Sequence, residues 1–241
     1  SIILVAMQAC GSGTASVGAP AQPTTETVTL NKSTVDVAIS PDGSRAYITG
    51  ALRDRGTDVS VIDTARPTAP PTTITLDQVG FPNGIAISSD GTRAYIVDNL
   101  TGNLFIIDTA RLNEVPEKIA IGGSPAGVAV SPDSARVYVT QAQYDAVSMI
   151  DAARPTAPAT VIAVGDSPSG IAVSPDGTRL YVANSKSSSI SVIDTARPTE
   201  TPLTIAVGSG PFNVAASPAG NRVYVSNSES ESVSVIDTAR I

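Results

Sequence analysis

The sequence predicts an all-β protein, a β-propeller of five four-stranded blades, and three observations support this prediction. The 241 residues contain five copies of a unit of about 43 residues. Each copy alternates apolar and polar residues with a period of two, which is typical of half-buried β-strands. Asp-Gly and Asn/Ser clusters divide each copy into short strands. Repeats of this length with four strands each are typical of propeller blades.

The copy at residues 171–207 shows the expected elements in order. Its inner strand covers 171–174, and a Pro-Asp-Gly turn leads to a second strand at 180–183. A polar turn leads to a third strand at 190–194, and an outer strand at 203–207 follows a proline-rich segment. Every second strand carries a tyrosine, namely Tyr47, Tyr95, Tyr138, Tyr181 and Tyr224. Every third strand ends in an aspartate, namely Asp63, Asp108, Asp151, Asp194 and Asp237.

Side-chain size in the inner and second strands agrees with a propeller. Blades converge at the axis, so only a small side chain fits between neighbouring inner strands there. The inner strands all carry alanine at one position, namely Ala38, Ala86, Ala129, Ala172 and Ala215. We expect the tyrosines to lie further out, where the wedge between blades is wider and an aromatic ring can be buried.

We expect the ring to be closed by the N-terminal strand completing the last blade. The last copy stops after its third strand at 233–237, whereas residues 27–30 read as a strand that precedes the first inner strand. Pairing of these two segments would give five four-stranded blades and remove the exposed edges of an open array. A fragment of a larger ring would show the same strand count, so that alternative stays open.

The chain divides into segments 1–10, 11–25 and 26–241. Residues 1–10 are an apolar run ending in Cys10, which resembles the end of a signal peptide with a lipobox whose cysteine is cleaved and acylated. An ordinary export signal and an ordered apolar strand are the alternatives. Residues 11–25 read as a flexible linker, and 26–241 as the propeller. We therefore expect an extracytoplasmic protein, held in the cell envelope or secreted, that contacts a membrane only through a lipid anchor at Cys10.

Composition argues against several classes of function. The net charge of −7 and the absence of a basic patch argue against nucleic acid as a partner, because phosphate binding needs clustered Lys and Arg. The sequence contains no histidine, which excludes Ser-His-Asp and Cys-His catalytic arrangements. We predict no cofactor and no metal site. The aspartates of the Pro-Asp-Gly turns and of the Asp-Thr-Ala-Arg segments are interpreted as turn residues and local ion pairs.

Two runs near the C-terminus, RLYVANSKSSSISVID and RVYVSNSESESVSVID, resemble the YVTN-type β-propeller repeat of bacterial and archaeal surface-layer and exported proteins. Residues 181–184 and 224–227 match the signature tetrapeptide almost fully, while the other three copies depart at its final Asn. The resemblance covers residues 26–241. It implies a propeller, commonly seven-bladed, in an extracytoplasmic setting, and it implies no single activity.

The loops on one face of the predicted propeller differ between copies, whereas those on the opposite face are nearly identical. This pattern favours a non-enzymatic binding or display scaffold whose variable face meets a protein or a cell-envelope glycan, with Phe81, Tyr144 and Phe212 as apolar contacts. Drift in unconstrained loops would give the same pattern. The candidate binding residues are Asp36, Arg53, Asp54, Arg55, Phe81, Asn83, Asp98, Asn99, Asn103, Tyr144, Asp145, Lys186, Phe212, Asn213, Glu229 and Glu231.

The alternative function is a divalent-metal-dependent enzyme of the lactonase or lyase type. Such propeller enzymes need carboxylates, a metal or histidine converging near the axis. Asp36 is the one residue that obviously points there.

Overall fold

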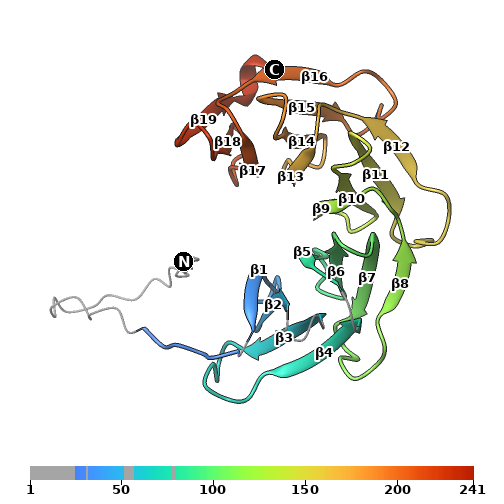
Figure 1. Cartoon of the computed structure of the whole chain (residues 1–241), viewed down its shortest axis with the longest axis vertical. Helices are drawn as coiled ribbons and strands as arrows, with labels where there is room; N and C mark the ends of the chain where they lie inside the picture. The colour runs from blue at the N-terminus through green and yellow to red at the C-terminus, as the bar shows by residue number, and fades with distance from the viewer. Residues whose placement is uncertain (1–24, 31, 52–56, 78–79) are drawn as a thin grey trace, which may run out of the picture.

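The computed structural model describes residues 25–30, 32–51, 57–77 and 80–241. Its strands form five antiparallel sheets arranged as an open arc (Figure 1). The first sheet contains β1 (Ser33–Ile39), β2 (Arg45–Ala51), β3 (Thr57–Asp63) and β4 (Thr72–Asp77). The second contains β5 (Pro82–Ile87), β6 (Arg93–Asp98), β7 (Asn103–Asp108) and β8 (Glu117–Ala120). The third contains β9 (Pro125–Val130), β10 (Arg136–Gln141), β11 (Ala146–Asp151) and β12 (Thr160–Ala163).

The last two sheets continue the same order. The fourth contains β13 (Pro168–Val173), β14 (Arg179–Asn184), β15 (Ser189–Asp194) and β16 (Leu203–Ala206). The fifth contains β17 (Pro211–Ala216), β18 (Arg222–Asn227) and β19 (Ser232–Asp237), followed by the short 3-10 helix η1 (Thr238–Arg240). Sequential strands are neighbours in every sheet. The first strand of each sheet lies on the inside of the arc, and the fourth strand of each four-stranded sheet lies on its rim, as in the blades of a propeller (Figure 1).

The predicted closure of the ring is wrong in this structure. Residues 27–30 belong to no strand, and the fifth sheet has three strands, with β19 at its edge. The first and fifth sheets stand at the two ends of the arc with a gap between them (Figure 1). Equal numbers of inner, second and third strands do not determine whether a ring closes, because an open arc of the same repeat contains the same strands.

The hydrophobic core lies between neighbouring sheets, and the second-strand tyrosines of the first four sheets are central to it. Tyr47, Tyr95, Tyr138 and Tyr181 are each 1% exposed. Tyr181, for example, lies in one cluster with Val214, Val223 and Val225 of the fifth sheet. The inner-strand alanines of the first four sheets pack at the margins of these clusters, as predicted.

The recurring aspartates have the structural roles that the sequence indicates. Each third-strand aspartate pairs with the arginine three residues later, at 2.7 to 2.9 Å in four copies and 3.7 Å in the fifth. In the first inter-strand turn, the Asp42 carboxylate accepts hydrogen bonds from the Ser40 hydroxyl and from the Ser44 amide and hydroxyl. These bonds, that of Ser40 first, lower the pKa of Asp42 to about 2.

The last residue of the second strand supports the adjacent turn from inside the sheet. The buried Asn184 Nδ2 donates to Ser189 Oγ and Ser191 Oγ, and Asn227 bonds two serines in the same way. In the first sheet the equivalent repeat position, three residues after the tyrosine, is Gly50. The Lys32 side chain fills the space there and forms an ion pair with Asp58. This ion pair was not predicted from the sequence.

Substitution by alanine is expected to destabilise the protein more at Tyr181, which lies between two sheets, than at Tyr224, which lies on the open face of the fifth sheet. Tyr181→Ala should lower the free energy of unfolding by about 3 kcal/mol or more, because it leaves a large cavity between two sheets. Tyr224 is 43% exposed at the end of the arc, so Tyr224→Ala should cost less than about 1 kcal/mol. Urea unfolding followed by circular dichroism measures both values, and equal losses would contradict this assignment of the core.

Candidate functional site

A groove of about 360 Å³ lies where the five inner strands begin. Every inner strand from β1 to β17 contributes to its lining, so the groove follows the inside of the arc. Each of these strands begins with a shift in pairing register relative to its second strand. Such irregularities re-aim side chains and are frequent beside binding sites.

Backbone crowding decides which inner strands can carry a side chain into this groove. At the same repeat position stand Asp36, Gly84, Gly127, Gly170 and Asn213. A Cβ at Gly127 would lie 2.5 Å from Ser169 O, and one at Gly170 would lie 2.7 Å from Phe212 O. The three middle positions are therefore restricted to glycine, and at this repeat position polar side chains occur only in the first and fifth sheets.

Asp36 is held in place by two backbone amides from different sheets. Its Oδ1 accepts a hydrogen bond from Val37 N at 2.8 Å, and its Oδ2 accepts one from Ile85 N at 3.1 Å. Burial raises the pKa of Asp36, and the two amide hydrogen bonds oppose the rise only in part. A fixed carboxylate with a raised pKa in a groove is typical of a general base or acid.

Two asparagine side chains and one aromatic ring also line the groove. Asn83 and Asn213 line it, and Asn213 Oδ1 accepts a hydrogen bond from Val214 N at 2.9 Å. Within the described ranges, neither Asn83 Nδ2 nor Asn213 Nδ2 donates a hydrogen bond, so both are available to a ligand. Phe212 lies in the same lining and exposes 63% of its surface.

The structure brings four of the predicted site residues together in this groove, namely Asp36, Asn83, Phe212 and Asn213. The prediction that Asp98 and Asn103 are exposed binding residues is wrong, since both are buried at the paired ends of β6 and β7. Arg53, Asp54, Arg55 and Cys10 lie outside the described residues. The remaining candidates lie outside the groove lining, and they are Phe81, Asn99, Tyr144, Asp145, Lys186, Glu229 and Glu231.

Some of the remaining candidates have structural roles of their own. Asn99 Nδ2 donates to Pro125 O, and Asp145 Oδ1 accepts from Ser167 N, so both tie neighbouring sheets or loops together. The Tyr144 ring lies against Gly123, where an added Cβ would be 2.5 Å from its Cδ2. The sequence missed the contribution of Ser169, whose hydroxyl donates to Phe212 O across two sheets.

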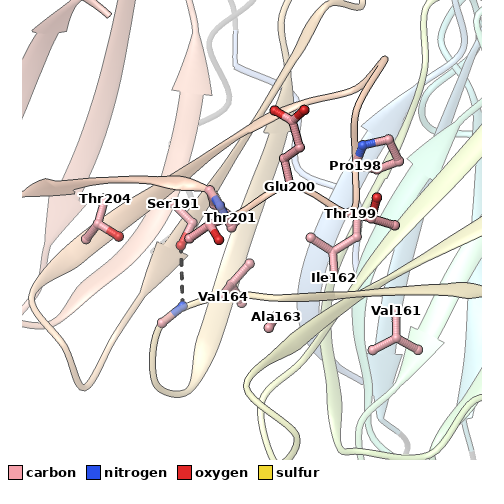
Figure 2. A pocket seen from close by; sticks show the side chains of 12 residues that line it. Val161, Ile162, Ala163, Val164, Ser191, Pro198, Thr199, Glu200, Thr201 and Thr204 are labelled. Carbon is pink, nitrogen blue, oxygen red and sulfur yellow. Dashed lines mark hydrogen bonds between the residues drawn. The ribbon is translucent and has the colours of Figure 1, made fainter.

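A second hollow of about 450 Å³ lies on the rim, between β12 and the segment that leads into β16 (Figure 2). Val161, Ile162 and Val164 supply much of its apolar lining. Glu200, which projects from the segment above, is paired with Arg197 at 3.2 Å. The one carboxylate of this hollow is already paired with an arginine, so the hollow is a weaker candidate for catalysis than the groove along the inner strands, which we call the axial groove.

The described residues contain no group of three or more His, Cys, Asp or Glu side chains placed to hold a metal ion. In the same part of the chain, no helix has the length and hydropathy needed to cross a membrane. The predicted acylation of Cys10 and the extracytoplasmic setting stay predictions.

Comparisons with known proteins agree with the fold. Residues 154–240 match the family model described as "Lactonase, 7-bladed beta-propeller". A protein of unknown function from Desulfotomaculum acetoxidans is 24% identical, with a TM-score of 0.67 over 87% of this chain and 71% of that one. The β-propeller domain of a Swd1 protein from Myceliophteria thermophila is 14% identical, with a TM-score of 0.70 over 85% of this chain and 65% of that one.

A protein from Bacteroides fragilis, assigned as a candidate 6-phosphogluconolactonase, is 15% identical. It superposes with a TM-score of 0.66 over 83% of this chain and 65% of its own length. No curated protein matches the sequence significantly. The chain has a β-propeller-like fold.

These findings correct the prediction that the protein is not an enzyme. The finding that contradicts it is the match of residues 154–240 to a family model described as a lactonase. The similarity to the Bacteroides fragilis protein, at 15% identity, concerns the fold alone. The family match favours the lactonase-like alternative over the binding scaffold. The prediction of a non-enzyme was based on the absence of histidine and of clustered carboxylates, and the groove contains a single carboxylate, that of Asp36.

Titration of the carboxyl groups is expected to show a higher pKa for Asp36 than for the turn residue Asp42. The Asp36 midpoint should lie above the ordinary value of 3.8, whereas Asp42 should titrate near 2. The contribution of Asp36 to stability is therefore fully present at low pH and is lost as the pH rises through its raised pKa. The contribution of Asp42 to stability depends on pH in the opposite direction: it is present at neutral pH and is lost as the pH falls toward 2. Carbon-13 NMR of the side-chain carboxyls measures both, and an Asp36 midpoint below 3.8 would contradict the burial argument.

Proposed function

We propose that the protein hydrolyses an uncharged lactone, the internal ester of a sugar acid, in the axial groove with Asp36 as general base. The observation that carries the proposal is the Asp36 carboxylate, which two amides from neighbouring sheets hold at the wall of the groove. The lactonase family match over residues 154–240 supports the choice of reaction.

Asp36 retains the capacity to bind a water molecule. An ionised carboxylate has about four lone-pair sites. Two of those sites are taken by Val37 N and Ile85 N. A water bound at a remaining site would pass its proton to Asp36 while its oxygen attacks the lactone carbonyl. When the ring C–O bond breaks, the leaving alkoxide takes that proton back, which yields the open hydroxy acid and regenerates the carboxylate.

The groove also supplies donors for the charge that develops on the carbonyl oxygen. An oxyanion needs N–H groups aimed at it from the start of the reaction. Asn83 and Asn213 supply amide N–H groups in the groove lining. Phe212 offers an apolar surface on which the carbon face of a sugar ring can lie.

The charge of the groove selects the substrate class. Asp36 is the single ionisable residue in the described lining, which contains no Lys or Arg. A phosphorylated lactone, the class named for the Bacteroides fragilis protein, would therefore find repulsion in place of a cationic partner. An uncharged lactone would not be repelled by the Asp36 carboxylate.

Hydrolysis of glucono-1,5-lactone above the spontaneous rate, followed with a pH indicator, tests the proposal. Asp36→Asn should lower kcat/KM by about 10² to 10⁴, the usual value of general base catalysis. Asp166→Asn removes an exposed carboxylate outside the groove and should leave the rate unchanged. EDTA should have no effect.

Full activity of Asp36→Asn, with unfolding temperature unchanged, would overturn the proposal. A higher kcat/KM for the 6-phosphorylated lactone than for the uncharged one would overturn the assignment of the substrate class.

A further inference from the structure

Asn83 and Gly84 are neighbours in the lining of the axial groove, and this pair of residues is chemically reactive. In an Asn-Gly pair, the backbone nitrogen of the glycine can attack the side-chain amide carbon of the asparagine, because glycine has no Cβ to obstruct the approach. Asn83 is the one asparagine in the sequence that is followed by glycine. A reaction at this pair would alter the groove itself.

The pairing of β5 with β6 passes over both residues. Pro82 pairs with Asp98, and the next pair is Ile85 with Ile96. A residue inside a regular ladder has its peptide fixed by hydrogen bonds to the neighbouring strand, whereas a residue at an irregularity is less restrained. Asn83 and Gly84 therefore lie where the backbone of β5 is freest to adopt the conformation that ring closure needs.

A hydroxyl group that holds the backbone at this point in three other sheets is missing here. The hydroxyl acceptors are Thr49 for Asp36 N at 3.1 Å, Thr140 for Gly127 N at 2.7 Å and Ser226 for Asn213 N at 3.1 Å. Gly84 occupies the repeat position of these donors. The hydroxyls all stand two residues after the second-strand tyrosine, where the second sheet has Val97. The Gly84 nitrogen therefore lacks the hydroxyl acceptor that restrains its counterparts.

The side chain of Asn83 is also unrestrained. Among the described residues it forms no hydrogen bond, whereas Asn213, the other asparagine of the groove, has its Oδ1 held by Val214 N at 2.9 Å. Val214 is β-branched, so its side chain crowds the approach of its own nitrogen to the asparagine. Of these two asparagines, Asn83 alone combines a free side chain with an unobstructed nucleophile.

Packing between sheets keeps glycine at position 84. A Cβ there would lie 3.0 Å from Ala126 O and 3.3 Å from Val128 N, both in β9. The close approach of the two inner strands therefore selects glycine, and an asparagine placed before it is necessarily part of an Asn-Gly pair.

We propose that Asn83 is a self-modification site, at which deamidation replaces an amide donor of the groove by a carboxylate and switches the activity off. The loss of activity rests on the proposed function. Gly84 N attacks Asn83 Cγ, and Nδ2 leaves as ammonia with the proton of the attacking nitrogen, which closes a succinimide ring. Water then adds to one of the two ring carbonyls and opens the ring, which leaves aspartate or isoaspartate at position 83.

Either product changes the electrostatics of the groove. One N–H donor for the developing oxyanion is lost, and a second carboxylate joins Asp36, the single ionisable residue in the described lining. The added negative charge would raise the pKa of Asp36 further, because like charges disfavour ionisation. It would also repel the charge that develops on the lactone carbonyl oxygen. Both the lost donor and the added charge oppose the reaction.

Incubation of the folded protein in heavy-oxygen water at mildly alkaline pH, followed by peptide mapping, tests the modification. Asn83 should gain the mass that corresponds to replacement of NH2 by a labelled OH, at a rate similar to that of the protein unfolded in urea. Asn213 is the internal control and should stay unmodified in the folded protein over the same time. Asn83→Gln removes the reactive pair, because a glutamine side chain would have to close a larger ring, and should show no mass gain at this position.

Activity and titration connect the modification with function. The kcat/KM for glucono-1,5-lactone should fall in step with the modified fraction of Asn83, and Asn83→Asp should lower it by about 10², the cost of one oxyanion donor. Asn83→Gln should keep its initial rate throughout the same incubation. The Asp36 midpoint in carbon-13 NMR should be higher in Asn83→Asp than in the unmodified protein, and this readout does not depend on activity.

Modification of Asn83 only after unfolding in urea would overturn the proposal. So would a modified Asn83 that leaves kcat/KM and the Asp36 midpoint unchanged. Fresh protein without lactonase activity, together with a raised Asp36 midpoint in Asn83→Asp, would overturn the proposed reaction and support the modification of the groove.

Discussion

The packing of one sheet on the next is the constraint on which this structure depends. A single four-stranded blade cannot bury both of its faces. Each blade therefore packs against the next one, which covers Tyr47 or the equivalent tyrosine. Arginine side chains add direction to this packing, because Arg45 Nη1 donates to Thr109 O and Arg179 Nη1 donates to Thr238 O, each in the next sheet. The result is a polar array, in which the two end faces differ from each other.

The same packing explains where polar chemistry occurs on the inside of the arc. Close approach of the inner strands leaves no room for a Cβ at Gly127 or Gly170, because the backbone of the next sheet lies in that space. In the first sheet, Asp36 replaces this contact with a hydrogen bond from its carboxylate to Ile85 N. Aspartate in place of glycine at position 36 thus keeps the two sheets in contact and also puts a fixed carboxylate into the groove.

The sequence predicted the repeating features well because identical local physics acts in every copy. The strand order, the buried tyrosines, the small inner alanines and the Asp–Arg pairs follow from period-two patterns and turn chemistry, and Asp36 was identified because it departs from that pattern. Closure of the ring was predicted wrongly, because it depends on the angle between blades, which no local pattern records. Asp98 and Asn103 were misplaced for a related reason: a polar residue at a strand end reads the same whether it faces solvent or supports a turn. Lys32 was missed because its role depends on the absence of a side chain at Gly50, in the neighbouring strand β2.

The axial groove and the open ends of the arc are physically connected through Asn213. It stands at the repeat position of Asp36, and its Oδ1 bonds only its own sheet, at Val214 N. Asp36 differs because a next sheet is present to offer Ile85 N. Asn213 Nδ2 donates no hydrogen bond among the described residues, so it can donate to a ligand in the groove. Exclusion of water strengthens every hydrogen bond made to a developing charge. The place of a sheet in the arc therefore decides whether the polar side chain at this repeat position is fixed by the next sheet, as Asp36 is, or is left to bind a ligand, as Asn213 is.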